Sequence, residues 1–196
     1  MTDKKTSPKS PTDEELILHF QEGDLYAFEQ IVQRYKEPLV NFIYHFLGDR
    51  TDAEDVVQET FLRVYRNKHL YRNIAKFSTW IYTIASNLAK TELRRRRRRR
   101  ILSISQMGFD DKDYDLPGDI ATPEGIVDGD MKESIIRDAI EKLPAKFKEV
   151  VVLRDVQEFS YEEISDILDI PIGTVKSRVN RGRQRLQKKL VHLLDN

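Results

Sequence analysis

The stretch that determines the fold most clearly is residues 160–186, which read SYEEISDILDIPIGTVKSRVNRGRQRL. It opens with a capping box, in which the Ser160 hydroxyl and the Glu163 carboxylate satisfy two free amides at the start of a helix. The apolar face of this short helix consists of Ile164, Ile167 and Leu168. Pro171 interrupts it, and a longer helix starts near Ile172. The pattern predicts a helix-turn-helix.

The longer helix of this motif is strongly basic. Among the last 27 residues, seven are Lys or Arg and only one is acidic. Its apolar stripe is Val175, Val179, Gly182, Leu186, Leu190 and Leu193. Such a charge bias favours DNA binding over the alternative, an amphipathic hairpin with a solvated basic face. The predicted DNA contacts are Thr174, Lys176, Ser177, Arg178, Asn180, Arg181, Arg183 and Arg185.

Composition sets further limits on the whole chain of 196 residues. It contains no cysteine, which excludes disulfides, thiolate metal sites and cysteine nucleophiles. No apolar run reaches the roughly 18 residues that a membrane span needs. The first residues lack the apolar segment of a secretory signal. We therefore expect a soluble, cytoplasmic protein.

The formal net charge is zero, with 33 basic and 33 acidic residues, but the charges are segregated. Residues 1–60 carry a balance of −7 and residues 61–109 a balance of +12. Residues 110–169 carry −11, and residues 170–196 carry +6. Two basic blocks separated by an acidic one predict two contacts with a polyanion.

The chain divides into helical and non-helical parts. Apolar residues recur at helical spacing over residues 12–100 and again over 131–196, and no strand-like alternation occurs. Residues 101–130 hold eight acidic side chains and one basic side chain, which is typical of a mobile linker. Residues 1–11 are expected to form a disordered tail. We predict an all-α protein with two small helical domains joined by an acidic flexible linker.

Within the first domain the sequence predicts four helices. Gly23 and Asp24 separate the first from the second, which continues past Pro38 as far as Gly48. A second capping box, from Thr51 to Glu54, is expected to open the third helix. The fourth is expected from about Phe77 to Arg100.

The third predicted helix, residues 52–66, has an apolar face and an acidic face. The inward residues are Val56, Val57, Phe61 and Val64, and the outer face carries Asp52, Asp55, Glu59 and Arg63. Grouped carboxylates can bind metal, but no Glu-x-x-His spacing or second carboxylate helix accompanies them. A solvated or protein-binding face is the better interpretation. Because phosphate-binding loops and nucleophile motifs are also lacking, we expect no catalytic, cofactor-binding or metal-binding residue, and no enzyme.

The first basic block contains seven consecutive arginines, Arg94 to Arg100, which alone could be a generic polyanion tether. Here aromatic and cationic residues precede them, a combination that suits unstacked, single-stranded bases. For Phe77 and Trp80 a role in the core is the favoured alternative. The predicted contacts in this block are Tyr71, Arg72, Asn73, Lys76, Trp80, Asn87, Lys90, Arg94, Arg95, Arg97 and Arg98.

Three motifs together resemble one family. They are DAEDVVQETF at 52–61, FSTWIYTIASN at 77–87 before the arginine run, and Leu143-Pro144 followed by YEEI at 161–164 and GTVKSR at 173–178. This ordered set resembles the bacterial extracytoplasmic-function (group IV) RNA polymerase sigma factors. Ser86 departs from the pattern, because many relatives have Arg before the Asn.

The resemblance implies that residues 12–100 are sigma region 2 and residues 131–196 are region 4. Region 2 would dock on the β′ coiled coil of core RNA polymerase, with β as a further contact. The implied docking residues are Asp52, Asp55, Gln58, Glu59, Phe61 and Arg63. The residues of the first basic block would read and melt the −10 promoter element, and those of the second would read the −35 element.

The family also implies the biological setting. The protein would initiate transcription of a stress or envelope-type regulon and be held by an anti-sigma factor, often at the inner membrane face. It would bind no small-molecule substrate and would not itself insert into the membrane. Two other classes remain open from the residues alone: a DNA-binding regulator independent of polymerase, and an enzyme acting on nucleic acid.

Overall fold

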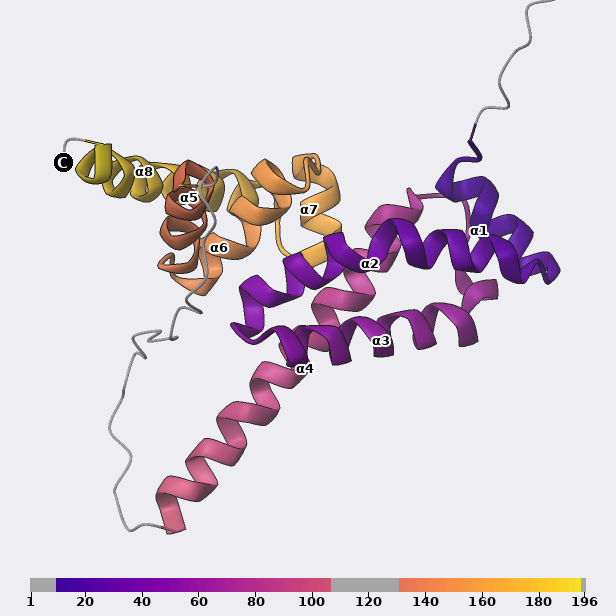
Figure 1. The fold of residues 1–196 in the computed structure, drawn as a ribbon, viewed down its shortest axis with the longest axis horizontal. Coiled ribbons are helices and arrows are strands. Elements are labelled where there is room, and N and C mark those ends of the chain that lie inside the picture. Colours follow the sequence, from indigo (N-terminus) through magenta and orange to yellow (C-terminus); the bar gives the residue numbers. More distant parts are fainter. Residues whose placement is uncertain (1–9, 107–130, 195–196) are drawn as a thin grey trace, which may run out of the picture.

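The computed structural model describes residues 10–106 and 131–194, with side-chain contacts over residues 10–99 and 135–191. The described backbone is helical and contains no strand (Figure 1). Its α-helices are α1 (Asp13–Glu22), α2 (Leu25–Leu47), α3 (Arg50–Arg66), α4 (Phe77–Gln106), α5 (Met131–Glu141), α6 (Ala145–Val151), α7 (Tyr161–Leu168) and α8 (Ile172–Leu194). A 3₁₀ turn, η1 (Lys68–Leu70), precedes α4, and a π-helical turn, η2 (Val152–Val156), follows α6. The prediction of an all-α protein is confirmed.

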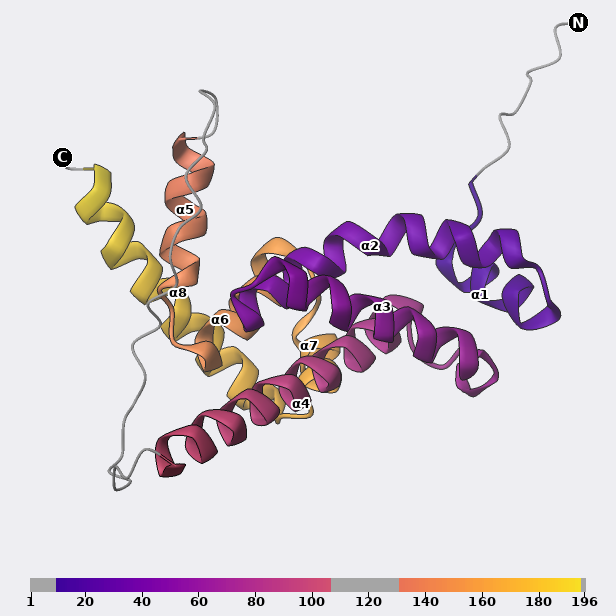
Figure 2. The same cartoon turned by 60° about the horizontal axis from the view of Figure 1, so that its bottom comes forward.

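Helices α1 to α4 pack around one apolar core. α2 and α3 lie side by side, and α4 passes diagonally across both of them (Figures 1 and 2). The largest side chains that are fully buried here include Phe20, Phe42 and Phe77. Gly48 ends α2 with φ +69°, a left-handed conformation that glycine adopts at little cost. Pro38 lies inside α2, as the apolar period predicted.

Three predicted boundaries differ from the structure. The third helix is capped by Asp49, whose carboxylate accepts from Asp52 N at 2.9 Å, so the predicted capping box at Thr51 is wrong. Helix α4 continues to Gln106, six residues into the predicted linker, whose remaining residues lie outside the described ranges. Pro11, assigned to the tail, accepts a hydrogen bond at 2.8 Å from Arg34.

Helices α7 and α8 form the predicted helix-turn-helix. The capping box is confirmed: Ser160 N donates to Glu163 Oε2 at 2.8 Å, and Glu163 N donates to Ser160 Oγ at 3.1 Å. Helix α8 crosses α6 at Gly182, where an added Cβ would lie 2.6 Å from Val151 Cγ2. A larger residue would therefore force the two helices apart.

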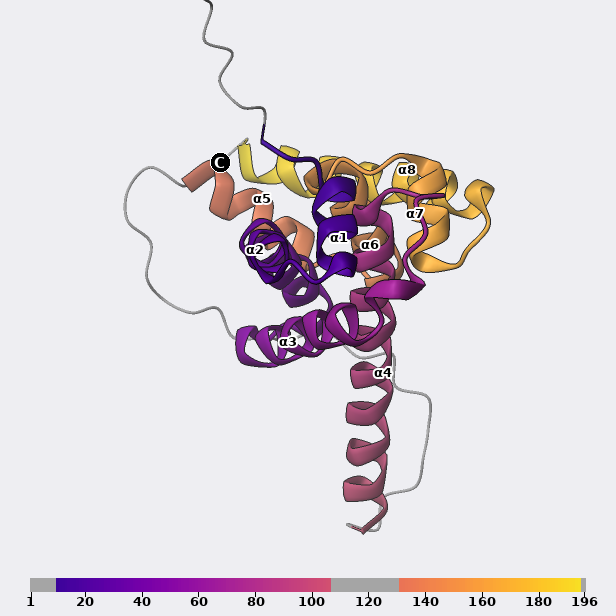
Figure 3. The ribbon, with the colours of Figure 1, turned by 90° about the vertical axis from the view of Figure 1, so that its right-hand side faces the viewer.

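The α5–α8 group packs against the α1–α4 group, chiefly α7 against α4 and α6 against α2. We call this the closed arrangement. The ring centroids of Tyr82 on α4 and Phe159 lie 4.8 Å apart, and the Tyr82 hydroxyl donates to Gln157 Oε1 at 2.5 Å. The last part of α4 extends clear of both groups (Figures 1 and 3).

Candidate protein and nucleic-acid interfaces

The outer face of α3 mixes carboxylates with apolar side chains. Asp55 and Gln58 are exposed, and Arg63 pairs with half-buried Glu59 at 3.1 Å within the helix. Leu62 and Tyr65, which are not among the predicted docking residues, are each 48% exposed on the same helix. Large apolar groups among charges are typical of a protein-binding surface rather than of a solvated face.

Two of the predicted docking residues have partners within the protein. Phe61 is 9% exposed and packs in the core. Asp52 forms an ion pair with Arg96, whose guanidinium also donates to Leu47 O at 3.0 Å. Asp52 therefore links α3 to α4, while its side chain stays 45% exposed.

A five-residue loop, residues 72–76, lies between Tyr71 and the start of α4 and is exposed throughout. Its most prominent side chain is Ile74, at 87% exposure, beside the predicted contacts Arg72 and Asn73. The loop is closed on itself, because Tyr71 Oη donates to Ala75 O at 2.8 Å and Ile74 N donates to Arg72 O at 2.7 Å. We call residues 72–76 the α4 loop.

The aromatic residues around this loop form a cluster. Tyr71 lies 5.7 Å from Phe77 and 5.4 Å from Trp80, measured between ring centroids. Tyr71 and Phe77 are buried, whereas Trp80 is half-buried. Burial, with the carboxylates of Glu14 and Asp13, raises the pKa of Tyr71. Tyr71 thus packs within this aromatic cluster rather than offering its ring to solvent, and the burial of Phe77 agrees with the core role favoured for it.

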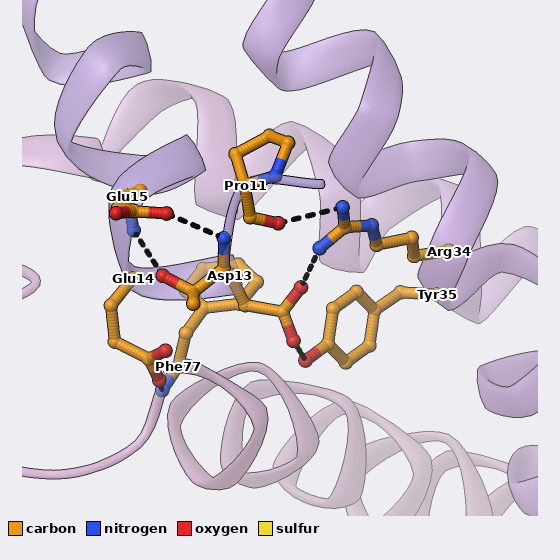
Figure 4. A network of polar contacts seen from close by, with 8 residues as sticks. Pro11, Asp13, Glu14, Glu15, Arg34, Tyr35 and Phe77 are labelled. Atoms are coloured by element: carbon orange, nitrogen blue, oxygen red, sulfur yellow. Dashed lines mark hydrogen bonds and ion pairs between the residues drawn. The ribbon is translucent and has the colours of Figure 1, made fainter. Parts of the chain in front are cut away.

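Helix α1 fastens the start of α4 through the polar network in Figure 4. Asp13 accepts from Arg34 Nη1 at 2.7 Å and from Tyr35 Oη at 2.5 Å. Its neighbour Glu14 accepts from the backbone amide of Phe77 at 3.1 Å. Thr12 and Glu15 form a capping box at the start of α1. This Thr-x-x-Glu signal is readable in the sequence but is not among the two capping boxes predicted above.

Along α4, the arginine run is divided between structural and exposed positions. Arg96 is turned toward α3, as described, and also pairs with Glu92. The predicted contacts Asn87, Arg94, Arg95, Arg97 and Arg98 are exposed. Arg95 pairs with half-buried Glu92 at 2.7 Å, one turn earlier in the same helix. Ser86, the position that departs from the family pattern, is buried.

On α8, the predicted contacts are exposed to different degrees. Lys176, Ser177, Asn180 and Arg181 are exposed, whereas Thr174 and Arg178 are half-buried. Two further arginines have partners on the preceding helices. Arg183 Nε donates to Asp155 Oδ2 at 3.1 Å, and the Arg185 guanidinium lies 5.2 Å from the Phe147 ring centroid.

The closed arrangement engages two of the residues predicted to contact the −10 element. Lys76 Nζ pairs with Glu163 Oε1 of α7 at 2.9 Å. Lys90 Nζ donates to the backbone oxygen of Leu168 at 2.9 Å. Burial raises the pKa of Glu149 on α6, although the charges of Lys90 and Arg178 oppose that rise. Cationic groups of both predicted DNA-binding surfaces thus lie close to acidic side chains of the second group.

Comparison with known proteins decides the family. The Sigma-70 region 2 family model matches residues 31–99, and the Sigma-70 region 4 model matches residues 133–186. The ECF RNA polymerase sigma-E factor of Haemophilus influenzae is 36% identical over 186 residues, covering 93% of this chain and 97% of the relative. The chain belongs to the ECF RNA polymerase sigma factors.

Other relatives agree with this membership. The ECF sigma factor SigW of Bacillus subtilis is 38% identical over 190 residues, covering 89% of this chain and 94% of SigW. Among solved structures, the sigma factor RpoE from Bartonella quintana, in complex with the anti-sigma factor NepR, superimposes with a TM-score of 0.61. It is 28% identical, and the match covers 83% of this chain and 96% of RpoE.

Membership gives this sigma factor a role in promoter recognition during transcription initiation, within a family of non-catalytic factors. The alternative of a regulator independent of polymerase is thereby removed. Over the described residues, no three His, Asp or Glu side chains are grouped as a metal site would require. Within those same ranges no helix has the length and apolar character needed to cross a membrane.

Proposed function

We propose that this sigma factor binds core RNA polymerase through the exposed face of α3. Asp55, Gln58, Glu59 and Arg63 would supply the polar contacts, and Leu62 and Tyr65 would supply the apolar area. The observation that supports this role is the exposure of both apolar residues among carboxylates. Asp52 and Phe61 would act indirectly, by holding α3 against α4 and the core.

For promoter contacts, the proposal assigns the α4 loop and the outer side of α4 to the −10 element. Exposed Arg72, Asn73 and Ile74 would meet a base that leaves the stack when the duplex melts, beside the aromatic cluster of Tyr71 and Trp80. The arginines that follow would bind the phosphate backbone, because a guanidinium makes strong bidentate contacts with phosphate oxygens.

The −35 element would be read by the exposed start of α8. A helix N-terminus is suited to a phosphate, and Lys176, Ser177, Asn180 and Arg181 extend from the first turns toward base edges. Arg178, Arg183 and Arg185 would contact the phosphate backbone of the DNA and so position it. Asp155 and the Phe147 ring support this division, because they already orient two of these side chains.

The proposal divides the chain into region 2 over residues 12–100, a linker, and region 4 over residues 131–196. It includes an anti-sigma factor as a further partner, which the RpoE–NepR complex of a relative supports. The site of action would be the cytoplasm, where polymerase and promoters meet, and an anti-sigma factor would hold the protein at the membrane face in the resting state. The regulon would be of a stress or envelope type.

Run-off transcription with purified core polymerase on fragmented genomic DNA tests the proposal directly. We expect discrete transcripts that depend on the added chain and whose start sites share two upstream elements. Core polymerase alone, and core with a vegetative sigma factor, serve as controls. Absence of chain-dependent start sites, despite binding to core, would contradict promoter recognition by this chain.

A further inference from the structure

The upstream end of the α4 loop is held by a single side chain of α1. Gln21 Nε2 donates to Lys68 O at 2.7 Å and to Tyr71 O at 3.1 Å. These two carbonyls bracket η1, the turn that leads into the loop. Since an amide nitrogen has two N–H donors in a fixed geometry, Gln21 fixes the spacing of both carbonyls at once. Lys68 returns a bond at 2.5 Å to Phe20 O.

The downstream end of the loop is held by a second residue of α1. Phe77 is the first residue of α4, and its free amide donates to Glu14 Oε1 at 3.1 Å. Lys76, which precedes it, carries only donors and cannot cap the helix with its own side chain. Glu14 therefore supplies an acceptor and a negative charge at the N-terminus of a helix 30 residues long.

Glu14 is itself well placed, because the first turn of α1 is anchored on both sides. Adjacent Asp13 binds Arg34 and Tyr35 of α2, and the Thr12–Glu15 capping box closes the start of the helix (Figure 4). Burial, followed by the bond to Asp13, raises the pKa of Tyr35, which keeps the phenol protonated and donating. The loop between the two anchor points contains only residues 72–76, all of them exposed.

We propose that Gln21 and Glu14 are positioning residues for −10 recognition: they fix both ends of the α4 loop and so determine which base it accepts. The inference rests on the proposed function of that loop. Both residues precede the segment 31–99 that the region 2 family model matches. Neither side chain would touch DNA, because each is occupied with backbone groups of the protein.

The test uses the full-length chain with core polymerase, on a promoter mapped by run-off transcription. Each −10 base is replaced in turn while the −35 element stays fixed. The variants are Gln21→Ala, Glu14→Ala and Glu14→Gln, which keeps an acceptor oxygen for the Phe77 amide. Glu22→Ala, at an exposed position next to Gln21, is the matched control. Affinity for a −35 duplex and the thermal midpoint are measured for every protein.

We expect Gln21→Ala and Glu14→Ala to lose about five- to tenfold in discrimination among −10 bases, the effect of one or two hydrogen bonds. Glu14→Gln should recover most of it, Glu22→Ala should resemble the wild type, and −35 affinity should not change. Equal loss of transcription on every −10 sequence, or unchanged discrimination, would overturn the inference. If Gln21→Ala does not fold, the comparison of Glu14→Ala with Glu14→Gln still tests the inference. A wild type that ignores −10 changes would instead contradict the proposed function.

Discussion

Removal of the Tyr82 hydroxyl should open the closed arrangement and strengthen −10 binding. The hydroxyl is buried and donates to Gln157 Oε1 at 2.5 Å, whereas the ring packs against Phe42 and Phe159. Tyr82→Phe keeps both ring contacts and removes only this hydrogen bond. A bond of this kind contributes about 0.5–1.5 kcal/mol, so about 1 kcal/mol shifts the equilibrium between closed and open forms roughly fivefold.

The functional consequence follows from the positions of Lys76 and Lys90. Both are engaged with α7 in the closed arrangement, so −10 DNA must compete with Glu163 and with the Leu168 carbonyl. When the free protein is mainly closed, its apparent affinity for −10 DNA equals the affinity of the open form multiplied by the fraction that is open. Tyr82→Phe should then raise the affinity for a single-stranded −10 oligonucleotide by up to about fivefold, in line with the shift in the equilibrium.

Two assays separate the steps of this reasoning. Because the natural chain has no cysteine, Glu29→Cys on α2 and Gln187→Cys on α8 can carry a pair of dyes that report the separation of the two groups by energy transfer. Fluorescence anisotropy of the oligonucleotide reports affinity. Tyr26→Phe, at a tyrosine 66% exposed, is the control. If Tyr82→Phe lowers energy transfer but leaves −10 affinity unchanged, competition between α7 and DNA is refuted.

Three further outcomes are expected. Changing Asp55 and Glu59 together to Lys should abolish co-purification with core polymerase while circular dichroism stays unchanged, since both carboxylates lie on the outer side of α3. Arg181→Ala should weaken −35 binding by about 1–3 kcal/mol if its contact is bidentate, and reduce the slope of log affinity against log salt by about 0.9, as salt titrations will measure. Burial raises the pKa of Glu141, but hydrogen bonds from His45 and a lysine outweigh it and hold the pKa below the usual value. Ionised Glu141 therefore stabilises the closed arrangement fully above the ordinary carboxyl range, and this contribution is lost as pH falls through the lowered pKa. Energy transfer between the two dyes should decline at acid pH, and it should decline less in Glu141→Gln.

Local signals in the sequence predicted local structure well. The Ser160–Glu163 box, the break at Gly23 and the course of α2 through Pro38 all depend on neighbouring residues, and each is present. The wrong prediction of a capping box at Thr51 also comes from reading a local signal. Asp49 also stands before a helical run, and it directly follows the left-handed Gly48, so the chain enters α3 two residues earlier.

Contacts between distant parts of the chain were beyond such signals. Nothing near Gln21 indicates that its amide meets the backbone of residues 68 and 71, and nothing near Phe77 indicates a cap from Glu14. The exposure of Ile74 likewise depends on the fold of the loop rather than on its composition. Periodicity did assign Phe61 to the inner face, which its burial confirms, whereas the family pattern placed it among the docking residues.

The closed arrangement also gives a physical reason for the segregated charges. Lys76 belongs to the basic block and Glu163 to the acidic block that follows it, and the structure pairs them across the two helical groups. Glu149 of the same acidic block lies close enough to Lys90 and Arg178 for their charges to oppose the rise in its pKa. Acidic side chains of α6 and α7 therefore lie close to the cationic groups that would otherwise attract phosphates. These contacts are few, and an ion pair with an exposed partner such as Lys76 is weak and screened by salt, so a polyanion that offers many phosphates at once can displace them.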